Sequence, residues 1–586
     1  MKKIHIILIS ILCGLSSCTS VLDKEPLDII SDDVLYPVLI DNYLLQCYAE
    51  MCFFNEMPYG ATQDWFNCMY ATGFADESTS AWTQTPKTHW LNISGGDWDW
   101  WGYPTVRKLN VFIEKMETAP VDEAVRTART AEARFLRAFA YFNMVKRYGG
   151  VPLILKAQQL SDSPEELYPK RATEEAVYQF ILDEMNDIID NRLLPDAYGA
   201  ADLGRPTLYA AAALKSRAAM YAGSIASWGT VQIDGLVGIP ADKKEHFWQE
   251  SLNASNRLLY GSPFALYEKY PDDRSKNYRN IFLDENNCEV IFSEIYDGKS
   301  GKGHSWDMWQ NPSGYNAWAG GQQNCVYLEF VESYENIDGS DPTIDREKVA
   351  QYYTWTLDEL WGKKDPRFKA SIYTQGTPWT HEGASVTLDY HVGIFVDGQW
   401  INDGFYEGVP ALGVCANNWR PTPFGILKYL DESSAMIPER YYSKTDWIVF
   451  RLGEIYLNFA EAAFELNKPD SALWAVNKIR ARAGMPELQS ITREQIRHER
   501  KIELAFEGNR YWDVRRWRTA VQDLSHAWHG MRYKLDWATQ KYYVEIVDNI
   551  CGTPEPYFNE MHYYWPIAQS RTQQNPNLLP NNPGWR

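Results

Sequence analysis

The sequence predicts a mainly α-helical protein in which tetratricopeptide-like helix pairs form a right-angled scaffold around a long irregular, partly β loop region. Two observations support this fold class. Apolar residues recur at helical spacing along residues 36–285 and again from 446 onward. Between them, at 286–445, the helical period is mostly lost and Gly, Asn, Trp and Tyr dominate. Paired helices need neighbours to bury their apolar faces, so we expect them to stack.

The first 18 residues have the pattern of a bacterial lipoprotein leader. Two lysines precede an apolar run from Ile4 to Leu15, which is too short to span a bilayer as a helix. The following residues, LSS before Cys18, have the form of a lipobox. We therefore predict a signal peptide at 1–17, a lipid on Cys18 and a lipidated tether at 18–35, with the lipid as the membrane anchor.

The N-terminal region, 36–285, contains the first series of helices. The strongest is EARFLRAFAYFNMVKRY at 132–148, whose apolar face is wide enough to be enclosed by other helices. A long aromatic stretch without period, 58–99, reads as a surface loop. Helices are expected at 42–51, 101–116, 132–148, 173–189, 208–222 and 248–259.

The C-terminal region, 446–586, opens with the most regular stretch of the chain. Two helices with small residues at their seam are separated by the break KPD, and we expect Asp470 to cap the second helix and Gly484 to end it. Thr492 and Gln495 predict a capping box for a third helix, which we expect Gly508 to close. A less regular tail is expected after residue 517.

Charged residues are frequent in residues 500–516, after the capping box of the third helix. Three pairs of oppositely charged residues in this segment are spaced i,i+3, which suits salt bridges on a helix. A charged catalytic or anion site is one interpretation, and a partly buried ion network that holds the scaffold together is the favoured one. The residues are Arg500, Glu503, Glu507, Arg510, Asp513, Arg515 and Arg516, and the expected local pairs are Arg500 with Glu503, Glu507 with Arg510 and Asp513 with Arg516.

Sequence motifs for catalysis or metal binding are absent or incomplete. The pair His498-Glu499 fails as a zinc motif because Ile502 occupies the place of the second histidine. Glycosidase carboxylate pairs are diagnostic only by their separation in space. The acids at 97 and 99 and at 338 and 341 are predicted to be solvated loop residues rather than cation ligands. We therefore predict no cofactor and no metal site, while a structural calcium ion stays open.

Composition points to the kind of ligand. The chain has 24 Trp and 37 Tyr, which suggests either a ring-stacking binding surface or an aromatic-rich core. A formal net charge of −20 disfavours nucleic acid as a partner, because an acidic chain repels phosphate backbones.

Five parts of the sequence resemble the SusD/RagB family, which are surface lipoproteins of the Bacteroidetes that bind glycans. These parts are the leader, residues 132–153, 452–462 and 500–517, and the ending WPIAQSRTQQNPNLLPNNPGW. The resemblance implies a SusD-like helical scaffold with a glycan site on irregular loops, placed as a lid on a SusC-like TonB-dependent transporter of the outer membrane. The loop-rich region 286–445 would then bind the ligand.

No residue motif of the family can be transferred to those loops, so the candidate contacts come from chemistry. Trp and Tyr rings can cover the apolar face of a sugar while amides bond to its hydroxyl groups. Two loop regions, 64–103 and 296–324, offer this mixture. For any one ring, packing beneath a loop is the alternative. The candidate glycan contacts are Trp306, Trp309, Trp82, Tyr315, Trp318, Tyr296, Asn311 and Trp98.

The sequence thus favours a binding protein over an enzyme. The preferred hypothesis is a lipid-anchored protein on the cell exterior that captures an oligosaccharide or polysaccharide and passes it to the transporter for nutrient uptake. One alternative is a peptide-binding uptake lipoprotein of the same family. Another is a glycan-degrading lipoprotein enzyme.

Overall fold

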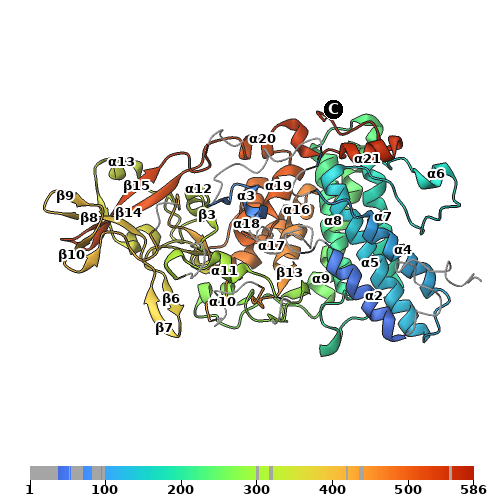
Figure 1. Cartoon of the computed structure of the whole chain (residues 1–586), viewed down its shortest axis with the longest axis horizontal. Helices are drawn as coiled ribbons and strands as arrows, with labels where there is room; N and C mark the ends of the chain where they lie inside the picture. The colour runs from blue at the N-terminus through green and yellow to red at the C-terminus, as the bar shows by residue number, and fades with distance from the viewer. Residues whose placement is uncertain are drawn as a thin grey trace, which may run out of the picture.

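The computed structural model describes residues 37–51, 53, 70–81, 94–95, 99–298, 303–315, 321–416, 420–433, 441–552 and 557–585. The molecule is elongated, with a group of long helices at one end, a twisted sheet at the other and the C-terminal helices between them (Figure 1). The described part is predominantly helical with several small sheets, which confirms the predicted mainly α class.

Long helices form the end of the molecule drawn in blue to green in Figure 1. Helix α5 has the enclosed apolar face that the sequence predicts, since almost every residue from Ala131 to Tyr148 is buried. Helices α8 and α9 lie so close that a Cβ on Gly223 would come within 2.8 Å of the Trp248 ring. The helices are α2 (Pro37–Glu50), α4 (Tyr103–Met116), α5 (Glu123–Tyr148), α7 (Glu174–Asp190), α8 (Leu208–Trp228) and α9 (Lys244–Gly261).

The C-terminal helices occupy the middle of the molecule. They are α16 (Leu452–Glu465), α17 (Pro469–Ala483), α18 (Arg493–Glu503) and α19 (Arg510–Arg516). Gly484 ends α17 in the left-handed conformation, and Thr492 with Gln495 forms the expected capping box. Two cap predictions were wrong. Asp470 lies within the first turn of α17 rather than capping it, and α18 ends at Glu503, before Gly508.

A five-stranded sheet forms the far end of the molecule (Figure 1). Its order is β4 (Thr354–Trp355), β15 (Lys541–Val547), β14 (Gly530–Asp536), β8 (His391–Val396) and β9 (Gln399–Ile401). The prediction of a less regular tail after residue 517 was wrong, because β14 and β15 form a seven-residue antiparallel hairpin. Strand β14 also pairs in parallel with β8, so the tail completes a sheet begun about 140 residues earlier.

Shorter elements fill the middle region and the edges of the helical parts. The helices are α3 (Tyr70–Gly73), α6 (Pro164–Leu167), α10 (Arg274–Asn280), α11 (Trp306–Gln310), α12 (Leu328–Glu332), α13 (Arg346–Ala350), α14 (Leu357–Trp361), α15 (Pro366–Ser371), α20 (Ala520–Asp523) and α21 (Gln569–Gln574). The strands are β1 (Ser78–Ser80), β2 (Val290–Glu294), β3 (Asn324–Val326), β5 (Ile372–Tyr373), β6 (Pro378–His381), β7 (Ala384–Thr387), β10 (Phe405–Tyr406), β11 (Val409–Pro410), β12 (Gly425–Ile426) and β13 (Trp447–Arg451). The 3-10 turns are η5 (Ala200–Asp202), η6 (Ile233–Gly235), η7 (Ala241–Lys243), η8 (Ser313–Tyr315), η9 (Glu560–Tyr563) and η10 (Pro576–Leu578).

One hydrophobic core runs through all of these parts. It includes Leu44 of α2, Trp306 of α11, Phe450 of β13 and Trp565 near the C-terminus. Strands β2 and β13 pair antiparallel and join the start of the irregular region to the start of the C-terminal helices. None of the helices in the described ranges has both the length and the apolarity needed to cross a membrane.

Candidate functional site

Helix α11 carries two of the predicted aromatic contacts, and both rings are enclosed. Trp306 and Trp309 are each only 1% exposed. The Trp306 Nε1 donates to the backbone carbonyl of Lys428 over 3.0 Å. Packing beneath a loop, the alternative considered for these rings, therefore describes both positions in this structure, because neither indole offers a face to solvent. Their contact with a ligand stays a prediction.

A buried histidine helps to hold α11 in place. The Trp306 backbone N–H donates to His304 Nδ1 over 3.1 Å, and burial lowers the pKa of His304 to about 4. The imidazole is therefore neutral at physiological pH and can accept this bond. Tyr296, another predicted contact, is 8% exposed and packs against the His304 ring with centroids 4.8 Å apart. Tyr296 thus also lies beneath the surface, as part of the support of α11.

Among the predicted aromatics within the described residues, Tyr315 in the turn η8 reaches the surface. It is half-buried, and its ring centroid lies 4.8 Å from that of His381 at the tip of β6. The β6–β7 hairpin projects from the body of the molecule (Figure 1). Burial raises the pKa of Tyr315, with further contributions from Cys415 and Asp389. The phenol is therefore neutral, and it presents an aromatic face beside a second ring.

Asn311 joins the Tyr315 turn to a buried layer of polar side chains. Its Nδ2 donates to the Tyr315 carbonyl over 2.7 Å, and its own carbonyl accepts from the Gln322 N–H over 2.8 Å. The Gln322 Nε2 in turn donates to the Thr422 carbonyl over 2.9 Å. We name Asn311, Gln322, Gln323 and Thr422 the polar cluster.

Each member of the polar cluster keeps an unused polar atom. Within the part of the chain that the structure describes, no hydrogen-bond partner is found for Asn311 Oδ1, Gln322 Oε1, Gln323 Oε1 and Thr422 Oγ1, although all four atoms are buried. Buried polar atoms without a partner are uncommon, since leaving one unpaired costs about 1–3 kcal/mol. The polar cluster thus combines unused acceptor atoms with side chains that are at most 2% exposed, directly beneath the Tyr315 turn.

The structure thus brings together only some of the predicted residues. Asn311 and Tyr315 are bonded to each other, whereas the side chains of Trp306, Trp309 and Tyr296 are buried. Trp82, Trp98, Trp318 and Cys18 lie outside the described residues. His381 was not predicted from the sequence, because its contact with Tyr315 joins segments 66 positions apart and no local pattern marks it.

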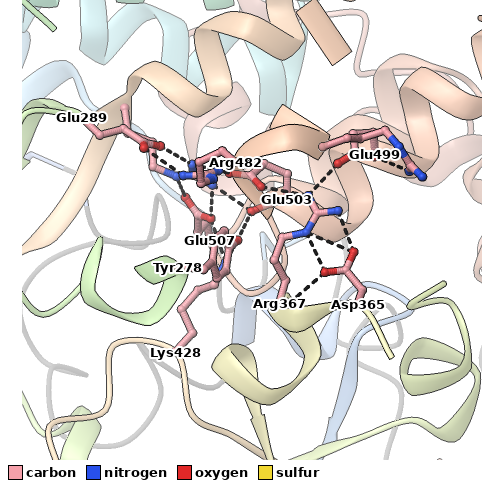
Figure 2. A network of polar contacts seen from close by, with 11 residues as sticks. Tyr278, Glu289, Asp365, Arg367, Lys428, Arg482, Glu499, Glu503 and Glu507 are labelled. Atoms are coloured by element: carbon pink, nitrogen blue, oxygen red, sulfur yellow. Dashed lines mark hydrogen bonds and ion pairs between the residues drawn. The ribbon is translucent and has the colours of Figure 1, made fainter. Parts of the chain in front are cut away.

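The charged segment singled out by the sequence contributes Glu503 and Glu507 to the ion network of Figure 2. Glu503 accepts from Arg451 over 2.7 Å and from Arg367 over 3.0 Å, and it also pairs with Arg482. Each of these four side chains is at most 1% exposed. The preferred interpretation, a buried ion network, is therefore confirmed for this segment apart from Arg515, which donates instead to the Tyr563 carbonyl.

The network balances its charges with partners from distant elements. The pKa of Glu503 lies well below its usual range. Burial alone would raise it, so the attraction of the surrounding guanidinium groups outweighs burial. Burial lowers the pKa of Lys428 to about 8, although Glu507 opposes this shift from 2.9 Å. The acids are Glu289, Asp365, Glu499, Glu503 and Glu507, and the bases are Arg367, Lys428, Arg451, Arg480 and Arg482.

The local pairs predicted for this segment were largely wrong. Asp513 and Arg516 do pair, at 2.9 Å. Arg500 instead binds Asp513 at 2.7 Å, and Arg510 binds Asp76 at 2.7 Å. Both guanidinium groups are buried, so tertiary packing rather than helical spacing selects their partners.

The acids considered as cation ligands are engaged elsewhere. Asp338 pairs with Lys363 at 2.7 Å, Asp341 accepts from the backbone and hydroxyl of Thr343, and Asp99 pairs with Arg571. Asp97 lies outside the described residues. In the described ranges, no three His, Cys, Asp or Glu residues gather closely enough to hold a metal ion.

Comparison with known proteins identifies the family. The SusD family model matches residues 288–585, and a second model, described as starch-binding associating with outer membrane, matches 21–220. The chain belongs to the SusD family. A SusD-like protein of Formosa agariphila is 26% identical over 552 residues, which are 87% of this chain and 90% of the relative.

Solved SusD-like structures share the fold over nearly the whole chain. One SusD-like protein from Bacteroides fragilis aligns with a TM-score of 0.74 at 25% identity, covering 96% of this chain and 100% of the other. A SusD-like protein described as laminarin binding aligns with a TM-score of 0.61 at 19% identity, covering 94% and 99%. The SusD-like scaffold predicted from the sequence is therefore confirmed.

Proposed function

We propose that this SusD-family protein is a surface lipoprotein that binds an oligosaccharide or polysaccharide and delivers it to a SusC-like TonB-dependent outer-membrane transporter. It acts by binding alone, without covalent chemistry or a cofactor. The observation that supports the proposal most is the position of Tyr315 and His381, two rings at the surface beside a buried cluster of unused hydrogen-bond acceptors. Family membership along nearly the full chain supports the ligand class.

The two parts of this site suit the two faces of a sugar. A pyranose ring has an apolar C–H face, which the Tyr315 ring can cover, and a rim of hydroxyl groups, which can hydrogen-bond to the half-buried His381 beside it. Each such polar contact replaces one with water, so we expect modest affinity for one site. Trp82, Trp98 and Trp318 belong to the same loop regions in the sequence and are proposed as further contacts. Trp306, Trp309 and Tyr296 are proposed to hold Tyr315 in position.

Isothermal titration calorimetry with laminarin, starch and xyloglucan oligosaccharides tests the proposal. Laminarin is included because one structural relative is described as binding it. For a bound glycan, Tyr315→Ala is expected to weaken affinity about five- to tenfold, since one aromatic contact contributes about 1 kcal/mol. Tyr260→Ala is the matched control, because Tyr260 is 68% exposed on α9 in the helical part. Equal affinity of wild type and Tyr315→Ala would contradict the site assignment.

A reducing-end assay on the same glycans and a titration with peptides separate the alternatives. An enzyme would release new reducing ends from a polysaccharide, and a peptide-uptake protein would bind peptides but none of the three glycans. Either result would overturn the proposed function.

Anchoring and partnership need separate experiments. We propose that Cys18 carries the lipid, so Cys18→Ala is expected to move the protein from the outer-membrane fraction to the soluble fraction of cells. Copurification of a TonB-dependent transporter with the wild-type protein checks the proposed partner. A Cys18→Ala protein that stays in the membrane fraction would show that the lipid is not its only anchor.

A further inference from the structure

The outer face of the five-stranded sheet carries a group of aromatic rings that has no role in the core. Strand residues alternate between two faces, and the register assigns Tyr543, Phe395 and Trp400 to the same side. Tyr543 lies opposite Lys534, whereas Phe395 lies opposite both Asp536 and Trp400. We name Phe395, Trp400 and Tyr543 the sheet patch.

The three rings form one contiguous cluster. Their centroids are 4.8 Å apart for Phe395 and Trp400, 5.5 Å for Phe395 and Tyr543, and 5.3 Å for Trp400 and Tyr543. All three side chains are half-buried, so each keeps part of its surface in water. Single exposed aromatics are ordinary on a protein surface, but contiguous apolar patches usually mark an interaction site.

The sheet patch lies on the face of the sheet that points away from the core. The opposite face of the sheet is packed into the core by Tyr533, Leu535, Ile394 and Val544, which are at most 7% exposed. The patch is also far from the long helices, because this sheet lies at the opposite end of the molecule from α2 to α9 (Figure 1). It is therefore a separate surface from any that those helices could form.

Charges around the patch nearly cancel. Lys534 sits over the Trp400 ring at 5.2 Å and pairs with Glu545 at 2.6 Å. On β14 and β15, the side chains on this face include three bases and two acids, namely Arg532, Lys534, Lys541, Asp536 and Glu545. Three bases against two acids leave this face nearly neutral, although the whole chain is acidic with a formal charge of −20. A nearly neutral aromatic surface with polar groups beside the rings complements an uncharged polyhydroxylated chain.

We propose that the sheet patch is a second glycan-binding surface, which takes a neutral polysaccharide. The ligand class rests on the proposed function, while the surface is distinct from the Tyr315 site. Two weak surfaces on one molecule raise the affinity for a long chain that reaches both, without improving the affinity for a short one. The sheet patch therefore adds avidity for polysaccharide and leaves oligosaccharide binding at Tyr315 unchanged.

Affinity electrophoresis in gels containing laminarin, starch or xyloglucan tests the proposal with the full-length protein. For whichever polysaccharide retards the wild type, the double variant W400A/Y543A is expected to bind at least about tenfold more weakly. Trp400→Phe, which keeps a flat ring, is expected to retain most of the binding. Tyr260→Ala again serves as the control, and thermal melts confirm that every variant is folded. Undiminished retardation of the folded double variant would overturn the proposal.

Hydrogen–deuterium exchange with the same polysaccharide locates the contact. Protection of peptides covering 391–401 and 541–547 would support the sheet patch. If peptides covering 303–315 showed no protection in the same experiment, that result would count against the Tyr315 site and not against the sheet patch. Protection of 303–315 alone would overturn the sheet patch and leave the proposed function standing.

One competing occupant is a second copy of the chain. Size-exclusion chromatography with light scattering checks this case, since a dimer that W400A/Y543A converts to a monomer would overturn the glycan assignment.

Discussion

Two buried polar regions of this protein differ in how completely they are satisfied. In the ion network of Figure 2, every ionised group has at least one partner of opposite charge, and the partners come from several separate elements. In the polar cluster below Tyr315, four buried atoms have no partner within the described residues. The ion network is paired by charge, although Arg482 Nε also has no hydrogen-bond partner within the described residues. The contrast therefore lies in charge pairing: opposite charges tie distant elements together in the network, whereas the polar cluster is neutral and lies beneath a surface ring.

The largest expected effect comes from removing the charge of Glu503 from the ion network. Glu503→Gln leaves Arg367, Arg451 and Arg482 without their shared charge, so we expect a loss of about 3–5 kcal/mol in the free energy of unfolding at pH 7. Denaturant unfolding measures it. The pKa of Glu503 is lowered in the folded state, so its contribution is present above the ordinary value of 4.5 and is lost as the pH falls below it. A gap between wild type and variant that persists unchanged well below pH 4.5 would contradict this assignment.

The next largest effect distinguishes an enclosed ring from a ligand contact. Trp306→Ala removes a ring that is 1% exposed and bonded to the Lys428 carbonyl, so we expect a loss of about 3 kcal/mol in stability. Tyr315→Ala, at a half-buried position, is expected to cost much less stability but more glycan affinity. Thermal melts and titration calorimetry on both variants provide the comparison. If Trp306→Ala abolished binding without lowering the melting temperature, Trp306 would be a direct contact after all.

A buried carboxyl on α11 provides a pH-dependent test. Burial raises the pKa of Asp307 to about 7, so the folded state keeps a proton that the unfolded chain loses above its ordinary value of 3.8. Wild-type stability should therefore fall as the pH rises from about 4 to 7. Asp307→Asn removes this dependence, and its stability relative to wild type should increase across that window by about 1–3 kcal/mol. Melts at pH 4.5 and pH 8 measure it, and a difference independent of pH would argue against a protonated Asp307.

The smallest effect comes from an exposed ion pair. Arg192 and Asp196 lie 2.6 Å apart, but their side chains are 60% and 49% exposed. Asp196→Asn is expected to change the free energy of unfolding by less than about 0.5 kcal/mol, because water already solvates both charges. Denaturant unfolding of Asp196→Asn and Glu503→Gln under the same conditions compares the two losses in the free energy of unfolding. A loss as large as that of Glu503→Gln would show that burial does not govern these pairs.

The sequence predicted helices best where the pattern is local. The enclosed helix α5, the left-handed cap at Gly484 and the capping box at Thr492 all depend on residues within one or two turns. The hairpin of β14 and β15 was missed although its residues alternate inward and outward, because two short strands become a stable sheet only with further partners. Those partners, β4 and β8, lie about 140 to 190 residues earlier in the chain.

By itself, the sequence determined the helical scaffold, its family and the presence of aromatic-rich irregular segments. Only the tertiary structure decided which charges pair and which rings face water. Arg510 reaches Asp76, and Tyr315 meets His381, across sequence separations that no helical or strand period covers. Trp306 and Tyr315 are both aromatic residues of one short loop region, yet one is enclosed and the other is not. The physical reason is that burial depends on all neighbours in space, whereas a sequence pattern reports only neighbours along the chain.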